Sequence, residues 1–273
     1  MKQSRVTSQD GLSLAVYEAG NPDGAEILFL HGFSQSALCW HLQMENPALL
    51  ARFRMVAYDI RGHGGSDQPD DPARYAAEAD FAADTMAVIA AMGLRRPVLV
   101  GWSYAGRLIN DYLRAHGTTG IAGINYVAAR TNSDPSHNGP GNAFLRDMIR
   151  LDLEREIKAT ENFLRACFFL PPPEHMLTRA RFYNMRVRPQ TRRAHLMRAP
   201  DDGAVLATID LPVLVTQGSR DQLVLPGMSQ HTATTVPGAE LSLYSGVGHM
   251  PFAESPDRFN LELTAFVSRC QNR

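Results

Sequence analysis

VLVGWSYAG, residues Val98–Gly106, is an apolar run that ends at a glycine and leads into a serine among small residues. The run is typical of a strand buried in a sheet, and the residues beyond it are typical of a helix. Gly101 and Ala105 lie two positions before and after Ser103, where only small side chains fit a tight strand-to-helix turn. Such a turn presents the serine hydroxyl above the sheet, at the positive end of the following helix. We therefore interpret Ser103 as a candidate nucleophile.

Stretches with the character of strands alternate with stretches of helical periodicity on both sides of this turn. Strands are predicted over Ser13–Glu18, Ala25–Leu30, Arg54–Ile60, Pro97–Trp102, Gly123–Ala129, Leu211–Gly218 and Glu240–Ser245. Helices are predicted over Leu38–Ala51, Tyr75–Met92, Ala105–His116, Gly227–Thr235 and Asp257–Cys270. This alternation favours an α/β fold, in which a mostly parallel, doubly wound sheet lies between layers of helices.

The alternation is interrupted between residues 131 and 207, which contain no convincing buried strand. Helical stretches are predicted over Asn142–Phe169 and Glu174–Arg198, and three consecutive prolines divide them. An all-helical insert between two halves of one sheet is expected to cover the carboxyl ends of the strands, where open α/β sheets bind ligands. We therefore predict a core formed by residues 1–130 and 208–273, and a helical cap formed by residues 131–207.

The composition is that of a globular protein that needs neither disulfides nor a metal to hold its core. The chain has 273 residues, of which 44% are hydrophobic and 20% charged, and its net charge is −1. This near-neutral charge favours neither nucleic acid nor an anionic membrane as a partner. The three cysteines, Cys39, Cys167 and Cys270, form no disulfide or zinc-binding pattern. Because no apolar signal segment or membrane-spanning run occurs, a cytoplasmic location is expected.

Motifs for nucleotides and metals do not occur in the sequence. We find no phosphate-binding loop, no G-x-G-x-x-G fingerprint and no H-E-x-x-H zinc motif. Three histidines of the insert, His137, His175 and His195, lack the spacing of metal ligands. We therefore expect no cofactor, no metal and a small-molecule substrate as the partner, whereas the oligomeric state is not indicated.

A serine nucleophile needs a base within hydrogen-bond reach and a third group that orients the base. Asp221 and His249 each follow closely on one of the last two predicted strands. They are therefore expected at the same edge of the sheet as Ser103, in the order serine, aspartate, histidine. Asp210 is a competitor, but it precedes its strand and is expected at the opposite edge. Taken singly, Asp221 could be a turn residue and His249 a loop residue, but together the three predict a catalytic triad.

The negative charge that develops on oxygen during acyl transfer needs preorganised backbone donors. The amide of Tyr104, next to the candidate nucleophile, is one expected donor. The second is expected in the loop after the strand Ala25–Leu30, where the sequence reads HGFS, and Phe33 N–H is the candidate. The alternative interpretation of this loop is a turn that simply ends the strand.

Five segments carry a resemblance to a known family: FLHGFSQS, YDIRGHGGSD, VGWSYAG, GSRDQLV and GVGHMPFAESP. In order and spacing they resemble the motif set of the α/β-hydrolase superfamily, over nearly the whole chain except the insert. Within it the chain is most similar to small bacterial esterases, lactonases and cofactor-free haloperoxidases or perhydrolases. The resemblance implies a triad of Ser103, Asp221 and His249, and an oxyanion hole formed by Phe33 and Tyr104.

Two positions depart from the patterns of these relatives. Ala105 stands where the serine turn usually has its second glycine, and its small size is compatible with the turn. Ser34 stands where haloperoxidases and perhydrolases often have proline, which argues against peroxyacid formation. Haloalkane dehalogenases and epoxide hydrolases are also similar, but they use aspartate as nucleophile where this chain has Ser103.

Substrate specificity is expected to arise between the cap and the triad, in an apolar pocket with a few polar groups. The substrate-binding candidates are Trp102, Val224 and Met250 from the core and Phe144, Phe168 and Phe182 from the cap. An aromatic at helical spacing more often packs in a core than lines a pocket, and that alternative stays open here. The stretch Glu174–Arg198 carries seven arginines and one acidic residue. It could recognise a carboxylate or phosphate, although a solvated face paired with acids elsewhere is the favoured interpretation.

These observations predict a cofactor-independent serine hydrolase that cleaves a carboxylic ester, lactone or thioester of a small molecule through an acyl-enzyme. A carbon–carbon bond hydrolase, an amidase or a perhydrolase with the same triad is the alternative among enzymes. A ligand-binding receptor on the same fold is the alternative from another class, and the complete triad argues against it. A protein with a vestigial site is a third alternative, since a fold alone does not decide function.

Overall fold

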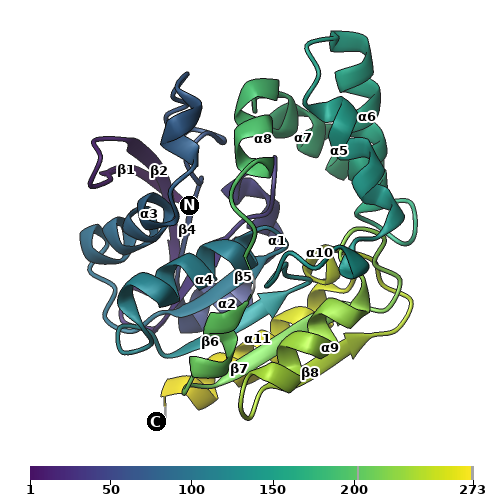
Figure 1. Ribbon diagram of the computed structural model, residues 1–273. Coiled ribbons are helices and arrows are strands. Elements are labelled where there is room, and N and C mark those ends of the chain that lie inside the picture. Colours follow the sequence, from purple (N-terminus) through teal and green to yellow (C-terminus); the bar gives the residue numbers. More distant parts are fainter. Residues whose placement is uncertain (202, 272–273) are drawn as a thin grey trace.

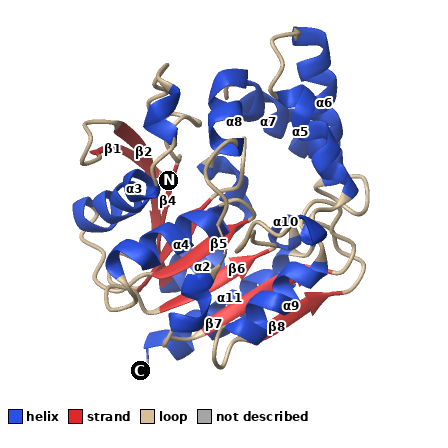
Figure 2. Cartoon of the chain, viewed as in Figure 1, coloured by secondary structure: helices blue, strands red, loops and turns tan. Residues whose placement is uncertain are grey.

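The computed structural model describes residues 1–201 and 203–271 and contains one eight-stranded sheet (Figures 1 and 2). Its strands are β1 (Lys2–Thr7), β2 (Ser13–Gly20), β3 (Ala25–Leu30), β4 (Phe53–Tyr58), β5 (Val98–Trp102), β6 (Gly123–Val127), β7 (Val213–Gly218) and β8 (Glu240–Tyr244). They lie in the order β1-β2-β4-β3-β5-β6-β7-β8. The pairs β1–β2 and β2–β4 are antiparallel and the other pairs are parallel. The predicted α/β fold with a mostly parallel sheet is therefore confirmed.

The central strands are the most apolar part of the chain because helices cover both of their faces. Every residue of β5, β6 and β7 is buried, as expected for parallel strands between two helical layers. Leu30 pairs with Gly101 across β3 and β5, and Trp102 pairs with Val127 across β5 and β6. The loops that follow these three strands therefore leave the sheet side by side, at one edge.

Among the described residues, seven α-helices belong to the part of the chain that forms the sheet. They are α1 (His41–Met44), α2 (Pro47–Arg52), α3 (Glu78–Ala91), α4 (Ala105–His116), α9 (Pro226–Thr235), α10 (Pro251–Glu254) and α11 (Pro256–Gln271). In Figure 1, α4 and α9 lie in front of the sheet, and α2 and α11 lie behind it. α4 packs on β5 and on α3, and α9 packs on β7. The sheet is thus covered on both faces, as a doubly wound fold requires.

Local departures from the predicted elements have local causes. The predicted helix Leu38–Ala51 is divided, because Pro47 begins α2 and the Asn46 side chain caps its first turn. The helix predicted from Tyr75 begins only at Glu78, after a separate 3-10 turn that starts at Pro72. The sequence patterns did not predict β1, because this edge strand is polar and mostly exposed.

Between β6 and β7 the chain leaves the sheet and forms a group of helices over its carboxyl edge. These are α5 (Leu145–Met148), α6 (Leu153–Ala166), α7 (Glu174–Met185) and α8 (Pro189–Leu196), and the described residues of this segment form no strand. Figure 1 shows them stacked beyond the carboxyl ends of the central strands. The inserted helical region predicted from the sequence is present, while the assignment of residues 131–207 as a separate cap domain stays a prediction.

Asp59, directly after β4, fastens the loop that follows β3. Its buried carboxylate accepts hydrogen bonds from Ala37 N at 2.7 Å, Gly65 N at 2.8 Å and the Tyr17 hydroxyl at 3.0 Å. The three donors come from separate segments of the chain, so one side chain joins β2, the turn after β4 and the residues that precede α1. This is the structural role of the YDIRGHGGSD segment.

The described residues contain neither a membrane-spanning helix nor a metal cluster. Within residues 1–201 and 203–271, no helix combines the length and the apolar character needed to cross a bilayer. The same residues include no group of three or more histidine, cysteine, aspartate or glutamate side chains placed to hold a metal ion. Burial raises the pKa of the Cys39 and Cys167 thiols, so both are expected to stay protonated and unreactive.

Candidate active site

Ser103 lies on the turn between β5 and α4 with a backbone φ of +56°. A positive φ is uncommon for a residue with a side chain and costs about 1–3 kcal/mol, so surrounding contacts must hold it. Ser103 N donates to Val127 O at 2.9 Å, and Ser103 O accepts from Gly106 N at 3.0 Å and Arg130 N at 2.8 Å. These bonds link the turn to β6 and the loop after it, and the predicted strained serine turn is present.

Small residues surround this turn because there is no room for larger ones. A β-carbon added to Gly101 would lie 2.5 Å from Ile109 Cδ1, and one added to Gly106 would lie 2.5 Å from Arg130 O. Ala105 is fully buried. The turn therefore accommodates the methyl group of Ala105 at the position of the usual second glycine, and this side chain stays buried.

The loop after β3 lies directly against Ser103. A β-carbon built on Gly32 would come within 3.2 Å of Ser103 Cβ and of the Trp102 ring, so the glycine allows this close approach. Within the described chain, the amides of Phe33 and Tyr104 donate to no carbonyl or side chain. Two backbone donors without a partner in the described chain thus lie near the serine: Tyr104 N at the amino end of α4 and Phe33 N in the loop after β3. Such donors suit an oxyanion hole.

Asp221 and His249 form a buried hydrogen-bonded pair at the same edge of the sheet. His249 Nδ1 lies 2.7 Å from Asp221 Oδ2, and Gln217 Nε2 donates to the same oxygen at 3.0 Å. The other oxygen, Asp221 Oδ1, accepts from Leu223 N at 2.8 Å and Val224 N at 3.0 Å. All the bonds to this carboxylate come from donors, so the proton of the imidazole is placed on Nδ1 and Nε2 is free to act as a base.

The loop that carries His249 is fastened to the helical insert and to the strand that carries the serine. His249 N donates to Cys167 O at 2.9 Å, and the Trp102 indole donates to His249 O at 2.9 Å. Glu254 accepts from Gly248 N and Phe169 N, both at 2.9 Å. The position of the candidate base therefore depends on both parts of the fold.

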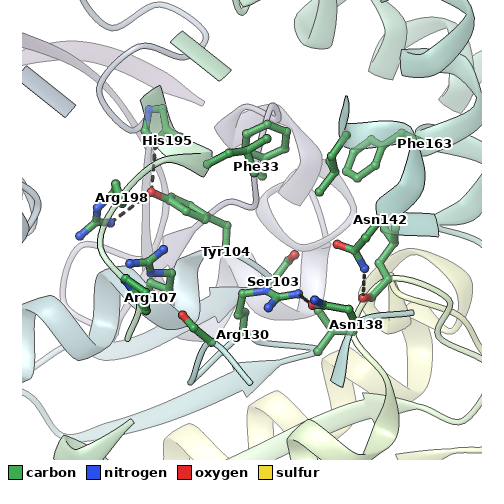
Figure 3. A pocket seen from close by; sticks show the side chains of 16 residues that line it. Phe33, Ser103, Tyr104, Arg107, Arg130, Asn138, Asn142, Phe163, His195 and Arg198 are labelled. Atoms are coloured by element: carbon green, nitrogen blue, oxygen red, sulfur yellow. Dashed lines mark hydrogen bonds between the residues drawn. The ribbon is translucent and has the colours of Figure 1, made fainter. Parts of the chain in front are cut away.

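Ser103 opens into a cavity of about 370 Å³ between the sheet edge and the inserted helices (Figure 3). Its lining is formed by Phe33, Ser103, Tyr104, Arg107, Arg130, Ser133, Asn138, Asn142, Leu145, Phe163, His195, Leu196, Arg198, Pro200, Leu223 and Val224. Figure 3 shows Phe33 and Phe163 on one side of the cavity, and Arg107, Arg130 and Ser103 on the other. The cavity is an apolar pocket with a cationic side, of a size suited to a small molecule.

Of the substrate-binding candidates, the structure brings only Val224 to this cavity, beside Phe33 and Tyr104. Trp102 is fully buried beneath it. Phe168 and Met250 line a separate small cavity with Tyr183. The remaining candidates lie outside both cavities: Phe144 is a partly buried packing residue, and Phe182 has 73% of its surface exposed on α7. Sequence periodicity missed Phe163 and His195, because their position depends on how the insert packs. It also gave no role in the lining to Arg107 and Arg130, which lie just beyond β5 and β6.

The side chain of Tyr104, predicted only for its amide, belongs to a buried polar chain. His195 Nε2 lies 3.2 Å from Arg61 O, which can only accept, so His195 Nδ1 accepts from the Tyr104 hydroxyl at 3.1 Å. Arg198 Nη1 donates to the same hydroxyl at 3.1 Å. Burial lowers the pKa of His195 to about 3, so the ring is neutral. These hydrogen bonds fix the side chain of Tyr104, which lines the cavity beside Ser103.

The arginine-rich stretch serves mainly in structural pairs. Arg181 bonds to Glu174 and Glu161 at the surface. Arg192 is buried, with Glu156 at 2.8 Å and the Ser34 hydroxyl at 2.9 Å. The predicted solvated face is therefore present only in part, because some of these arginines lie inside the insert.

Three buried neutral histidines predict acid sensitivity of the fold. Burial lowers the pKa of His31, His63 and His195 below the ordinary 6.5. The unfolded chain takes up these protons as the pH falls below about 6.5, while the folded chain does not, so the free energy of unfolding falls. Each histidine contributes a slope of up to about 1.4 kcal/mol per pH unit. Urea unfolding at several pH values between 7 and 5 measures this slope of the free energy of unfolding.

A pair of variants isolates one of these histidines. His195→Gln is expected to reduce the slope by the equivalent of one proton, whereas the exposed His175→Gln is expected to leave it unchanged. Equal slopes for wild type and His195→Gln would show that His195 takes up its proton over the same pH range in the folded and the unfolded protein, which would contradict the lowered pKa.

The chain is similar to known proteins along nearly its whole length. A family model described as "Alpha/beta hydrolase family" matches residues 27–262. A proposed aryl esterase from Burkholderia cenocepacia has a TM-score of 0.95 and 35% identity, over 100% of both chains. The esterase RhEst1 from Rhodococcus sp. ECU1013 has a TM-score of 0.91 and 34% identity, over 98% of this chain and 99% of that chain. A non-heme chloroperoxidase from Streptomyces lividans is 27% identical, over 96% of this chain and 98% of its own length.

Proposed function

The chain belongs to the alpha/beta hydrolase family, as its sequence motifs predicted, and on this premise we propose that it is a serine hydrolase. The substrate is a small-molecule carboxylic ester, lactone or thioester. One observation carries the proposal: Ser103, held at φ +56°, lines the cavity beside Phe33 and Tyr104, whose amides make no hydrogen bond within the described chain. Strained, exposed nucleophiles beside unpaired donors are a feature of acyl-transfer sites.

In the proposed reaction, Ser103 Oγ attacks the carbonyl carbon while His249 Nε2 accepts the hydroxyl proton. The amides of Phe33 and Tyr104 stabilise the oxyanion. Collapse of the tetrahedral intermediate breaks the bond to the leaving alcohol, which takes the proton from His249 and leaves an acyl-enzyme. Water then attacks the acyl carbon with His249 as base, and the acid departs as Ser103 regains its proton. The 2.7 Å bond from Asp221 to His249 supports these roles, since it stabilises the imidazolium that forms.

The relatives support an ester-type bond. Two structures that are more than 30% identical to the chain over almost all of its length are described as esterases, one of them a proposed aryl esterase. The cavity of about 370 Å³ supports a substrate of small-molecule size.

The chloroperoxidase relative supports a second candidate activity of the same site. Hydrogen peroxide would then replace water in the second step, attack the acyl carbon and leave as the peroxyacid, with the proton returned to Ser103. Ser34 departs from the proline of that group: its amide donates to His63 Nε2 at 3.1 Å, a bond that proline cannot make. Hydrolysis is therefore the primary proposal.

A fluorophosphonate probe and p-nitrophenyl acetate test the proposal together. The wild-type protein is expected to be labelled once per chain, at the peptide that contains Ser103, and to release p-nitrophenol catalytically. Adding hydrogen peroxide with acetate as the acid, and assaying peroxyacid, measures the second candidate in the same preparation. A folded wild-type protein that neither reacts with the probe nor turns over any ester, thioester or lactone would overturn the proposal in favour of a ligand-binding receptor.

A further inference from the structure

The charged side chains that line the cavity above Ser103 are all positive. Three arginines, Arg107, Arg130 and Arg198, contribute to its lining, and none of its described residues is an aspartate or glutamate. Guanidinium groups in a site of this kind are costly to bury unless an anion accompanies them. Within the described residues, only Arg198 of these three forms an ion pair with a carboxylate.

Arg198 is fully compensated. Its Nη2 donates to Asp111 Oδ2 at 2.6 Å, its Nη1 donates to the Tyr104 hydroxyl, and its guanidinium lies 4.0 Å from the centre of the Phe81 ring. This arginine serves the polar chain behind Tyr104 and needs no further anion.

Arg107 is buried, with 6% of its surface exposed, and forms no ion pair with any carboxylate in the described chain. Its Nη2 donates to Ala199 O, and its buried Nε has no hydrogen-bond partner. Arg107 lies four positions after Ser103, in the first turns of α4. An unpaired donor of a buried cation therefore stands next to the nucleophile turn.

Arg130 is the second arginine of the cavity lining that forms no ion pair with a carboxylate among residues 1–201 and 203–271. Its guanidinium donates to Asn138 Oδ1, and its own amide donates to Ser103 O at 2.8 Å. Burial and the positive charge of Arg107 both lower the pKa of Arg130. The two guanidinium groups thus lie near enough to repel one another.

The carboxylates that act on this pair from a distance are already bound elsewhere. Asp111 is held by Arg198, and Asp221 is held by His249 and three further donors. Figure 3 shows both arginines on the same side of the cavity as Ser103. The empty space next to them is therefore the place where a counter-ion can enter.

We propose that Arg107 and Arg130 bind a carboxylate of the substrate, so that the preferred substrate is an ester or lactone that carries a second, free carboxylate. This inference rests on the proposed hydrolase function and names the substrate class within it. The planar guanidinium matches the two oxygens of a carboxylate, and two adjacent cations can share one such anion.

Matched ester pairs measure this preference. Monoethyl adipate is compared with ethyl hexanoate, and 4-acetoxybutanoate with butyl acetate; in each pair a terminal methyl replaces the carboxylate. Acid release is followed by titration at constant pH. In at least one pair the wild-type kcat/KM is expected to be about 10- to 100-fold higher for the anionic ester, the range for one or two charge-assisted hydrogen bonds.

Variants locate the source of the preference. Arg107→Gln and Arg130→Gln are each expected to reduce the anionic-to-neutral ratio about tenfold or more, mainly through KM. Arg130→Lys keeps the charge and loses the planar guanidinium. Its anionic-to-neutral ratio is expected to lie between those of wild type and Arg130→Gln. Arg193→Gln is the matched control, since this exposed arginine lies on the insert but outside the cavity lining, and its ratio is expected to equal that of wild type.

The outcomes separate this inference from the proposed function. Turnover of neutral esters with no preference for the anionic ester in either pair overturns the inference and leaves the hydrolase proposal intact. A preference that survives in both glutamine variants, or that Arg193→Gln abolishes equally, also overturns it. If no ester is hydrolysed at all, the proposed function fails and the inference fails with it. If the glutamine variants do not fold, the wild-type ratio and the lysine variant still decide.

Discussion

Ser103→Ala is expected to lower kcat for ester hydrolysis by about four to six orders of magnitude, because it removes the only nucleophile of the proposed mechanism. The substitution removes one hydroxyl oxygen from a side chain at the cavity surface and keeps the β-carbon, so the free energy of unfolding is expected to change little. The residual rate reflects the remaining amide donors and the binding cavity. Steady-state kinetics with p-nitrophenyl acetate and urea unfolding measure both quantities.

Two further serine variants complete this test. Ser136→Ala, at an exposed position outside the cavity lining, is the matched control and is expected to retain wild-type kcat. Ser103→Gly is expected to be as inactive as Ser103→Ala but more stable than it by about 1 kcal/mol, because glycine adopts a φ of +56° without strain. A Ser103→Ala protein that retains a tenth or more of wild-type activity would refute the nucleophile assignment.

Asp221→Asn is expected to lower kcat by about 10⁴-fold, because it changes which nitrogen of the His249 imidazole carries the proton. Two backbone amides, those of Leu223 and Val224, donate to Asp221 Oδ1, so the amide oxygen of asparagine is held at that position. Its NH2 group then faces His249 Nδ1, which must accept instead of donate. The proton of the imidazole moves to Nε2, where it blocks removal of the Ser103 proton. The effect is expected in kcat at all pH values at which the imidazole is neutral.

Asp210→Asn is the control for this substitution. Asp210 precedes β7, at the opposite end of the strand from Asp221, and accepts a hydrogen bond from the Thr118 hydroxyl. The Asp210→Asn variant is expected to retain wild-type kcat. Equal losses in the two variants, or a loss below tenfold in Asp221→Asn, would show that Asp221 does not set the tautomer.

The sheet, and the edge of the sheet at which the candidate triad residues lie, could be predicted because both follow from short stretches of sequence. Runs such as VLVGW are apolar over their whole length since each strand is covered on both faces, and β5, β6 and β7 lie within one or two residues of their predicted bounds. Asp221 and His249 lie in the loops that follow β7 and β8, so their edge of the sheet could be inferred from chain direction alone. Chain direction does not give the distance between the two side chains. The structure places His249 Nδ1 2.7 Å from Asp221 Oδ2.

The lining of the cavity could not be predicted in the same way, because it is decided by how the insert packs on the core. Phe182 and Phe163 both lie on helices of the insert, yet one is exposed and the other lines the cavity. Periodicity shows on which face of a helix a residue lies, but it does not show what that face packs against. Arg107 and Arg130 carried a usable signal, since each lies just beyond a strand at the active edge, but an arginine near a loop is too common to stand out without its contacts.

Trapping the acyl-enzyme shows whether Ser103 carries the acyl group between the two steps. Wild-type protein is mixed with saturating p-nitrophenyl acetate, quenched in acid within the first turnover, digested and analysed by peptide mass spectrometry. We expect one acetyl group on the peptide that contains Ser103, which appears with the first p-nitrophenol released and disappears as substrate is exhausted. Turnover with that peptide unmodified at every quench time, or with the acetyl group on another side chain, would contradict it.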